Sequence, residues 1–555
     1  MDTFNSVMLA LSLTVSMAAA VCMLRRPAGA VPMGRQSKNT YRLFLLLILI
    51  AGIALRVWDF GSIPGGVNQD GAMAAVDAKA LADYGTDRFG TWLPCHLYAW
   101  GYGQMSSLMS YLIAPLVKLF GLSVVTMRIP SLLCSIAGGV FFYLFMRYVF
   151  GERAGLIAAL LVAINPWHLI QSRWALDCNL LPHFFMGGLY FLNRGLTEKK
   201  RFLYISMLFF GLCMYCYGIT IYTVPLFLVA VCAFYMIKKR VTLRIAAVCA
   251  LVYLLIAWPF ILTMAVNFFG WDTIELPFVT IQHFTASVRA GDILFFSDKP
   301  IEQLIANFKS LLNVTLLQVK DLPWNDMDGF GTMYLFTVPF AILGLFGFFK
   351  GRGADNRWLA LFALLTGIWV GIVTNGVNVN RINIIYYAEL MFIALGVYYA
   401  VTALPKLTIP TACALLLSGA LMAGTYFGAY AESVKHYFFY GLEDAITAAE
   451  DSGADRLYIS ADLQYKGYYN VSEILTLFYD GTDAHYFQGL TDEDHGKTLL
   501  PYRERFHYLS LSPELIEETK DSSAAYVGTA SDAALFDPEE FDIIISGDYC
   551  AAVRK

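Results

Sequence analysis

A short polar run near the start of the chain contains the first residue that could do chemistry. The run is Gly-Gly-Val-Asn-Gln-Asp-Gly at residues 65–71, and the carboxylate of Asp70 could act as a general base toward a hydroxyl group. Residues 70–84 have the composition of a helix that Gly85 stops. Either Asn68 or Asp70 would cap this helix, so capping is the alternative role for Asp70.

A second acid, Asp77, lies on the same face of the predicted helix. It follows Asp70 by seven residues, which is about 10 Å along a helix axis. The two carboxylates are therefore too far apart to chelate one ion directly.

A second polar stretch, residues 165–179, lies at the end of an apolar segment. It contains Arg173 and Asp177, whose spacing of four residues corresponds to one helical turn. The two side chains could form a structural ion pair worth only a fraction of a kcal/mol. A functional role is the alternative, because ionisable groups at membrane depth are costly and usually functional.

Two further stretches contain polar residues between apolar segments. In residues 374–383, Arg381 stands among asparagines and offers permanently charged, forked donors to a phosphate group. Anchoring at lipid headgroups is its alternative role. Residues 323–331, Pro-Trp-Asn-Asp-Met-Asp-Gly-Phe-Gly, are rich in turn formers, and a metal or substrate loop is the weaker interpretation.

Composition determines the kind of element that must hold these stretches. The chain has 555 residues, of which 58% are hydrophobic and 15% charged, and its mean hydropathy is +0.56. A soluble core cannot absorb so many apolar segments, so the chain is predicted to be a polytopic helical membrane protein. The net charge of −4 argues against nucleic acid as a partner. The ten cysteines fall mostly in apolar segments, and packing explains even the C-x-x-C pattern at Cys213 and Cys216.

The predicted topology has about 12 spans, with both termini outside the cytoplasm. Residues 5–24 are apolar, uncharged and long enough to cross a ~30 Å hydrocarbon core. Basic residues follow them, which favours a signal anchor. Residues 153–170 are expected to form one later span. Residues 105–121 are apolar but short, and a juxtamembrane helix there places all later basic loops in the cytoplasm.

The prediction divides the chain into three parts. Residues 1–40 contain the signal anchor and a basic cytoplasmic loop with Arg26 and Arg35. Residues 41–430 form the transmembrane domain, and residues 431–555 form a small soluble α/β domain outside the cytoplasm. The long outer loops are 58–126 and 267–332. In the soluble domain we expect a helix over 434–452 and strands at 456–460, 524–528 and 541–546.

Further motifs, taken in their order and spacing, resemble a known superfamily. The first is a long outer loop with an early Asp, and the second is an interfacial helix that ends in Lys118-Leu119-Phe120-Gly121. The next span then opens with Met127-Arg128-Ile129-Pro130-Ser131. The inner end of that span carries Arg147-Tyr-Val-Phe-Gly-Glu-Arg153. Over roughly residues 41–400, the chain resembles the GT-C membrane glycosyltransferases. It is most similar to the branch of the protein O-mannosyltransferases and the lipid A aminoarabinose transferases.

The resemblance implies a plasma-membrane enzyme that moves one sugar from a polyprenyl-phosphate donor to an acceptor hydroxyl on the non-cytoplasmic face, with inversion. Asp70 matches the acid that acts in catalysis, as general base, and Asp177 matches a further acid that orients the acceptor or the base. Arg381 matches the residue that binds the donor phosphate, and Arg173 is a possible second phosphate ligand.

The chain departs from the family pattern at Gly71, where a second acid is common. The role of that acid is then unfilled or moved to Asp77. The remaining candidates for substrate binding are Asn68, Gln69, Asp77 and Asn380. No cofactor is required by this scheme, and no ligand cluster calls for a divalent metal. A protein, a glycolipid or a cell-wall polymer could be the acceptor.

The main alternative from another class is a carrier, either a lipid flippase or a secondary transporter. Carriers usually place polar residues near the bilayer midplane, often in two related halves. Here the charges gather in loops and at span ends, without a visible internal repeat. The sequence therefore favours the transferase.

Overall fold

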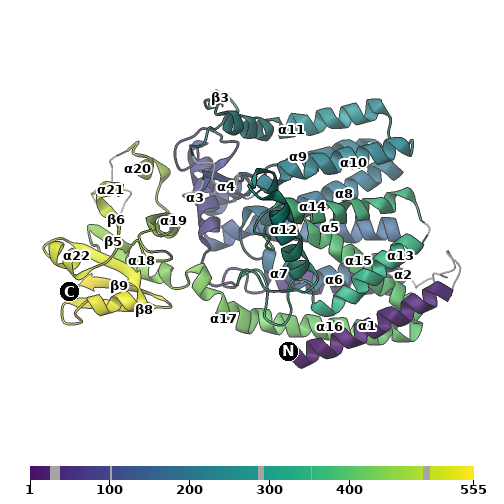
Figure 1. The fold of residues 1–555 in the computed structure, drawn as a ribbon. Coiled ribbons are helices and arrows are strands. Elements are labelled where there is room, and N and C mark those ends of the chain that lie inside the picture. Colours follow the sequence, from purple (N-terminus) through teal and green to yellow (C-terminus); the bar gives the residue numbers. More distant parts are fainter. Residues whose placement is uncertain (26–37, 100–102, 286–292, 352, 492–499) are drawn as a thin grey trace.

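Apolar helices lie side by side and form the body of the protein, with a small domain at one end (Figure 1). The structure is a computed structural model that describes residues 1–25, 38–99, 103–285, 293–351, 353–491 and 500–555. Arg26 and Arg35 of the predicted basic loop lie outside these ranges.

Within the described ranges, eight helices are long and apolar enough to cross a membrane, counting the short turns that extend some of them. Their α-helical parts are α1 (Asp2–Arg25), α2 (Lys38–Val57), α5 (Val124–Phe150), α10 (Val224–Ile237), α11 (Leu243–Phe269), α14 (Trp358–Val373), α15 (Ile385–Ala403) and α16 (Thr408–Thr425). The predicted polytopic helical membrane protein is confirmed at this level, and the number of 12 spans stays a prediction.

Shorter helices fill the space between and above these spans. The body contains α3 (Gln69–Tyr84), α4 (Leu108–Phe120), α6 (Glu152–Ala163), α7 (Pro166–Gln171), α8 (Leu181–Thr197), α9 (Arg201–Cys213), α12 (Pro300–Thr315) and α13 (Val338–Lys350). Two small hairpins pair β1 (Leu97–Ala99) with β2 (Gly103–Met105) and β3 (Ile274–Leu276) with β4 (Val279–Ile281). The 13 residues of α4 extend about 20 Å, as do those of α9 and α13, so the juxtamembrane position of α4 stays a prediction.

The expected single span over 153–170 is interrupted. Helix α6 ends at Ala163, and the Asn165 side chain caps a new helix, α7, by accepting a hydrogen bond from the His168 amide at 2.9 Å. Pro166 then occupies the first turn of α7, where its missing N–H costs nothing.

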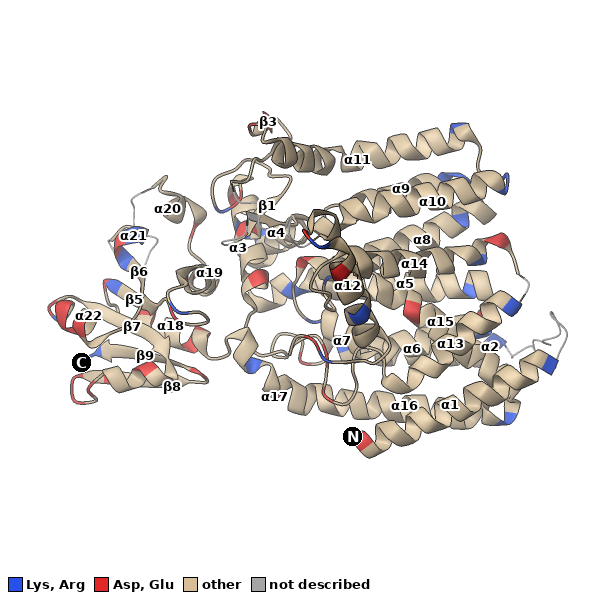
Figure 2. Ribbon diagram, viewed as in Figure 1, with Lys and Arg blue, Asp and Glu red and all other residues tan. Residues whose placement is uncertain are grey.

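Charge is distributed unevenly along the spans. Figure 2 shows Lys and Arg gathered at the span ends that point away from the C-terminal domain, the ends that the prediction places in the cytoplasm. Helix α1 runs beside α13: the Asn5 amide donates to the Gly329 carbonyl at one end, and the Lys350 ammonium donates to the Met23 carbonyl at the other.

The C-terminal domain is built on a mixed five-stranded sheet in the order β6-β5-β7-β9-β8. The strands are β5 (Arg456–Ser460), β6 (Phe506–Leu509), β7 (Ala524–Thr529), β8 (Phe541–Ser546) and β9 (Tyr549–Arg554). Strand β5 pairs in parallel with β6 and β7, whereas β9 is antiparallel to β7 and β8. The helices are α17 (Ala431–Ser433), α18 (Leu442–Asp451), α19 (Tyr469–Asp480), α20 (Ala484–Gln488), α21 (Tyr502–Arg505) and α22 (Pro513–Glu518).

The three predicted strands are present, but β6 and β9 are additional. The predicted helix over 434–452 starts only at Leu442, because positive φ angles at Phe439 (53°) and Gly441 (94°) break the chain direction before it.

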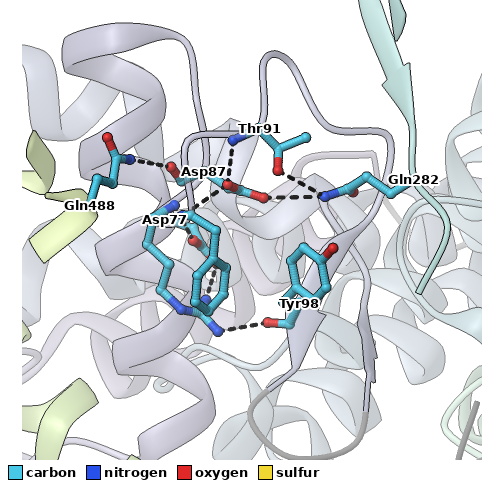
Figure 3. A network of polar contacts seen from close by, with 8 residues as sticks. Asp77, Asp87, Thr91, Tyr98, Gln282 and Gln488 are labelled. Atoms are coloured by element: carbon cyan, nitrogen blue, oxygen red, sulfur yellow. Dashed lines mark hydrogen bonds and ion pairs between the residues drawn. The ribbon is translucent and has the colours of Figure 1, made fainter. Parts of the chain in front are cut away.

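The C-terminal domain is docked on the first outer loop (Figure 3). The Gln488 side chain donates to the Asp87 carbonyl at 2.9 Å, and the Asp87 carboxylate accepts from Gln282 at 3.4 Å. Close by, the Tyr84 hydroxyl donates to Asp483 at 2.7 Å. Three segments that are distant in sequence therefore meet around Asp87.

Candidate functional site

Asp70 lies in the first turn of α3 and is half-buried. The side chain of Asn68, not that of Asp70, caps the helix: its carbonyl oxygen accepts the Asp70 amide at 2.9 Å. At the other end, Gly85 stops the helix in a left-handed conformation, with φ of 72°. The capping role that competed for Asp70 is thus already taken by Asn68.

Two fully buried arginines hold the chain that leads into Asp70. The guanidinium of Arg128, in the first turns of α5, donates to four carbonyls between Phe60 and Gly66, at 2.7–3.5 Å. Arg173 donates to the carbonyls of Leu55, Arg56, Asp59 and Ile63 at 2.8–3.3 Å. Buried carbonyls must be hydrogen bonded, so these two side chains determine where the segment runs.

Arg173 therefore lies in a different place from the one predicted. Residues 172–176 form turns rather than helix, so the one-turn spacing to Asp177 does not apply. The guanidinium is directed at the end of α2 and lies 5.2–5.5 Å from the ring centroids of Tyr426 and Phe427. Its donors are engaged with backbone, which leaves little capacity for a phosphate.

Asp177 lies on the segment that packs against the start of α3. It is buried and accepts the Cys178 amide at 2.7 Å, at the start of the turn that leads into α8. Gly71, which follows Asp70, lies against Ala175, which precedes Asp177 by two residues. The segments that carry the two carboxylates are thus in contact.

The packing of Gly71 explains why this chain has no second acid after Asp70. A β-carbon at this position would lie 3.0 Å from the Ala175 carbonyl oxygen and 3.4 Å from the Met127 sulfur. A carboxylate side chain would push the Asp177 loop away from α3. The close contact of the two loops therefore requires glycine.

Asp77 is occupied elsewhere. It is fully buried and pairs with Arg88 at 2.5 Å, and Arg88 also donates to the Tyr98 carbonyl at 2.8 Å (Figure 3). This pair braces the first outer loop, and it places Asp77 inside the loop rather than on a substrate-facing surface.

The loop of Arg381 reaches the same region through Asn383. This fully buried amide accepts the Trp167 indole N–H at 2.8 Å and donates to the Cys178 carbonyl at 3.0 Å. Arg381 is half-buried and donates to the Asn375 carbonyl. The structure therefore links the Arg381 loop to the residue that follows Asp177.

Two of the predicted substrate-binding amides have oxygens with no hydrogen bond. Gln69 Oε1 and Asn380 Oδ1 are buried, and no described residue donates to either of them. A buried oxygen without a hydrogen bond destabilises the folded protein, unless a ligand or water donates to it.

Sequence reasoning missed a buried polar chain beneath these loops. Arg56 contacts His168 at 2.7 Å, His168 contacts the Tyr387 hydroxyl at 2.8 Å, and the same hydroxyl contacts His183 at 3.0 Å. The only signal in the sequence is the occurrence of single polar residues within apolar segments. Among the described residues, no group of three or more His, Cys, Asp or Glu side chains could hold a metal ion. The prediction that no metal is needed stays a prediction.

The loop over 323–331 forms turns, as expected, and buries one acid. Asp326 is 3% exposed, and burial followed by the charge of Asp321 raises its pKa to about 7. The native protein then retains a proton that the unfolded chain releases between about pH 4 and pH 7, so stability falls over that window.

Asp326→Asn should remove this pH dependence. We expect the Tm of the variant to exceed that of the wild type by an amount that grows as pH rises from 4 to 7 and reaches about 2–4 °C. Thermal unfolding in detergent from pH 4 to pH 8 measures this difference. Asp328→Asn is the control, because Asp328 is exposed and pairs with Lys320. A difference that does not change with pH would contradict the assignment.

Residues 106–262 match the family model described as dolichyl-phosphate-mannose-protein mannosyltransferase. No curated protein matches the sequence significantly.

Among solved structures, the chain is similar to ArnT from Cupriavidus metallidurans bound to undecaprenyl phosphate. The TM-score is 0.56 at 13% identity, covering 93% of this chain and 98% of that one. The archaeal oligosaccharyltransferase AglB from Archaeoglobus fulgidus, in complex with an inhibitory peptide and a dolichol-phosphate, has a TM-score of 0.48 at 15% identity, covering 90% and 71%. The resemblance indicated by the sequence motifs is thereby confirmed: residues 106–262 match the dolichyl-phosphate-mannose-protein mannosyltransferase family model, and the chain shares its fold with the ArnT structure.

Proposed function

We propose that this protein transfers a single sugar from a polyprenyl-phosphate donor to an acceptor hydroxyl on the non-cytoplasmic face of the membrane. The observation that carries the proposal is the contact of Gly71 with Ala175, which packs the segment of Asp70 against that of Asp177, while Asn383 ties the Arg381 loop to the Cys178 carbonyl. This packing supports a site that combines a base, a second carboxylate and a cation. The family match and the bound lipid of the ArnT structure support a polyprenyl-phosphate donor.

The chemistry needs only one displacement. Asp70 accepts the proton of the acceptor hydroxyl as that oxygen attacks the anomeric carbon. The bond from the anomeric carbon to the phosphate oxygen breaks, and its electron pair leaves with polyprenyl phosphate. Arg381 stabilises the charge that develops on the phosphate. A single attack inverts the anomeric configuration, and Asp177 orients the acceptor or the base.

The unsatisfied amide oxygens fit the sugar part of such a donor. The oxygens are Gln69 Oε1 and Asn380 Oδ1. In the sequence, Gln69 comes directly before the proposed base Asp70, and Asn380 comes directly before the proposed phosphate ligand Arg381. Each can accept a hydrogen bond from a sugar hydroxyl, which would remove the cost of burying it.

The test is release of polyprenyl phosphate by the purified protein from a panel of polyprenyl-phosphate sugars. Water or a membrane extract can replace the unidentified acceptor. Turnover of one donor supports the proposal. Movement of lipid or solute across vesicles, without turnover of any donor, would instead favour a carrier.

Arg381→Ala should weaken donor binding without unfolding the protein. A charge-assisted hydrogen bond contributes about 1.5–3 kcal/mol, so we expect the KM for the donor to rise roughly tenfold or more. Steady-state kinetics measure the effect. Lys309→Ala is the control, because Lys309 is an exposed cation of α12. Equal effects of the two substitutions would show a general charge effect and exclude the assignment of Arg381.

A further inference from the structure

The segment that joins the last span to the C-terminal domain runs directly over the proposed site. We call residues 435–441 the strap. It begins as a 3-10 turn (Lys435–Phe438) and ends where Gly441 starts α18. The Phe438 side chain is 1% exposed and that of Phe439 is 3% exposed. A connecting segment that buries both aromatic rings has a packing role beyond simple linkage.

The strap binds the loop of Asp70 through backbone. The Val67 amide donates to the Phe438 carbonyl at 2.6 Å, and the Gly66 carbonyl of the same peptide unit accepts from Arg128 at 2.7 Å. The N–H of this peptide is thus held by the strap, and its carbonyl is held by Arg128 of α5.

The glycine pair before Val67 is explained by the same contact. A β-carbon on Gly66 would lie 2.0 Å from the Phe438 carbonyl oxygen, and one on Gly65 would lie 2.8 Å from the Tyr440 ring. Gly66 also has φ of 83°, which side-chain-bearing residues rarely adopt. Only glycine permits this approach.

The strap touches the loop of Asp177 through a side chain. The Phe438 ring meets the Trp174 ring edge to face, with centroids 5.5 Å apart, and Trp174 is 3% exposed. Val67 precedes Asp70 by three residues, and Trp174 precedes Asp177 by three. One residue of the strap, Phe438, therefore contacts both acid-bearing loops.

The opposite side of the strap is held by the C-terminal domain. The Phe439 ring stacks on Tyr549 of β9, with centroids 6.4 Å apart. A β-carbon on Gly441 would lie 2.2 Å from the Ser546 carbonyl oxygen, and one on Gly547 would lie 2.5 Å from that of Tyr440. The strap is thus enclosed between the turn after β8 and the two loops.

We propose that Phe438 is a positioning residue, through which the C-terminal domain sets the separation of Asp70 and Asp177. This inference rests on the proposed function for its catalytic meaning, while its structural part stands on the contacts of the strap. Asp70 and Asp177 lie on separate segments of the chain, and the strap is one short segment that contacts both of them. A small displacement of either carboxylate lowers the rate of a reaction that depends on the orientation of its catalytic groups.

The test compares Phe438→Ala with Phe439→Ala in the full-length protein. The two substitutions remove the same ring from neighbouring, equally buried positions, but only the Phe438 ring contacts Trp174, on the Asp177 segment. The hydrogen bond from the Val67 amide to the Phe438 carbonyl is made by backbone and is available in both variants. Amide hydrogen exchange of residues 62–72 and 172–180 is measured for each variant, together with kcat and KM for the donor. Phe438→Leu is a second variant, which keeps apolar volume if the alanine variant folds poorly.

We expect Phe438→Ala to accelerate exchange most in residues 172–180, where the ring contact is lost, and less in residues 62–72, where the backbone hydrogen bond to the strap remains. We expect kcat to fall about tenfold to 100-fold, with KM changed less than about twofold. Phe439→Ala should accelerate exchange only within residues 431–555. The same exchange pattern and the same kcat in both variants would overturn the proposal. If the wild type turns over no donor, the proposed function fails, and the exchange measurements alone still decide whether the strap holds the two loops.

Discussion

Asp70→Asn is expected to lower the release of polyprenyl phosphate by about 100-fold or more, with little change in the KM for the donor. An amide cannot accept the proton of the acceptor hydroxyl, so the loss should appear in kcat, as for a missing general base. Asn is nearly the same size as Asp, and Asn68 already caps α3. The fold should therefore be retained, and Tm should change little.

Asp83→Asn provides the matched control on the same helix. Asp83 is partly exposed and pairs with Lys79 at 2.8 Å and Lys118 at 3.3 Å. Its loss should leave activity within about threefold of the wild type, because exposed ion pairs contribute little. If Asp70→Asn behaved like Asp83→Asn, Asp70 would not be the base.

Arg173→Leu is expected to have the largest effect on stability. The substitution removes the donor of the carbonyls of Leu55, Arg56, Asp59 and Ile63. The bond to Arg56 is buried, and a buried carbonyl left without a donor costs about 1–3 kcal/mol. We therefore expect a large fall in Tm, or loss of folded protein. Thermal unfolding and gel filtration in detergent measure the effect.

This substitution also separates the structural role of Arg173 from its predicted phosphate role. Arg381→Ala is the comparison, since Arg381 belongs to an outer loop and is half-buried. A stable Arg173→Leu protein with a raised KM for the donor would restore Arg173 as a phosphate ligand. An unstable protein would support its role as an anchor for the end of α2.

The sequence was sufficient for the features that depend on composition and local pattern. Apolar length predicted a polytopic helical protein, and the alanine-rich run ending at Gly85 predicted α3. The abrupt change of character after residue 430 predicted a small α/β domain, and three of its five strands were identified. Each of these features depends on neighbours within about twenty residues.

The features that the sequence missed depend on partners distant in the chain. Strand β9 contains Ala551 and Ala552, and it is a strand because it fills the space between β7 and β8. The break at Asn165 replaces a predicted continuous span, since a local cap prevailed over apolar length.

In the candidate site, too, the sequence predicted what depends on local motifs and missed what depends on distant partners. The sequence motifs identified Asp70 and Asp177, and in the structure the segments that carry them are in contact through Gly71 and Ala175. The ion pair of Arg173 with Asp177 was predicted from their spacing, but the spacing rule holds only inside a helix, and this loop is not helical. Arg128 stood in a motif used for recognition, yet its role required the positions of carbonyls more than sixty residues earlier in the chain.

The enclosed strap also determines how this protein can be recombined with its relatives. A boundary drawn where the spans end, near residue 431, would transfer the strap together with the sheet, and the Gly66–Val67 peptide would then face a foreign backbone. A boundary at Leu442 leaves residues 435–441 with the loops they contact. A hybrid joined after the strap therefore keeps the contacts of the strap with the proposed site, and its foreign domain must match the contacts of Phe439 and Gly441 with the sheet.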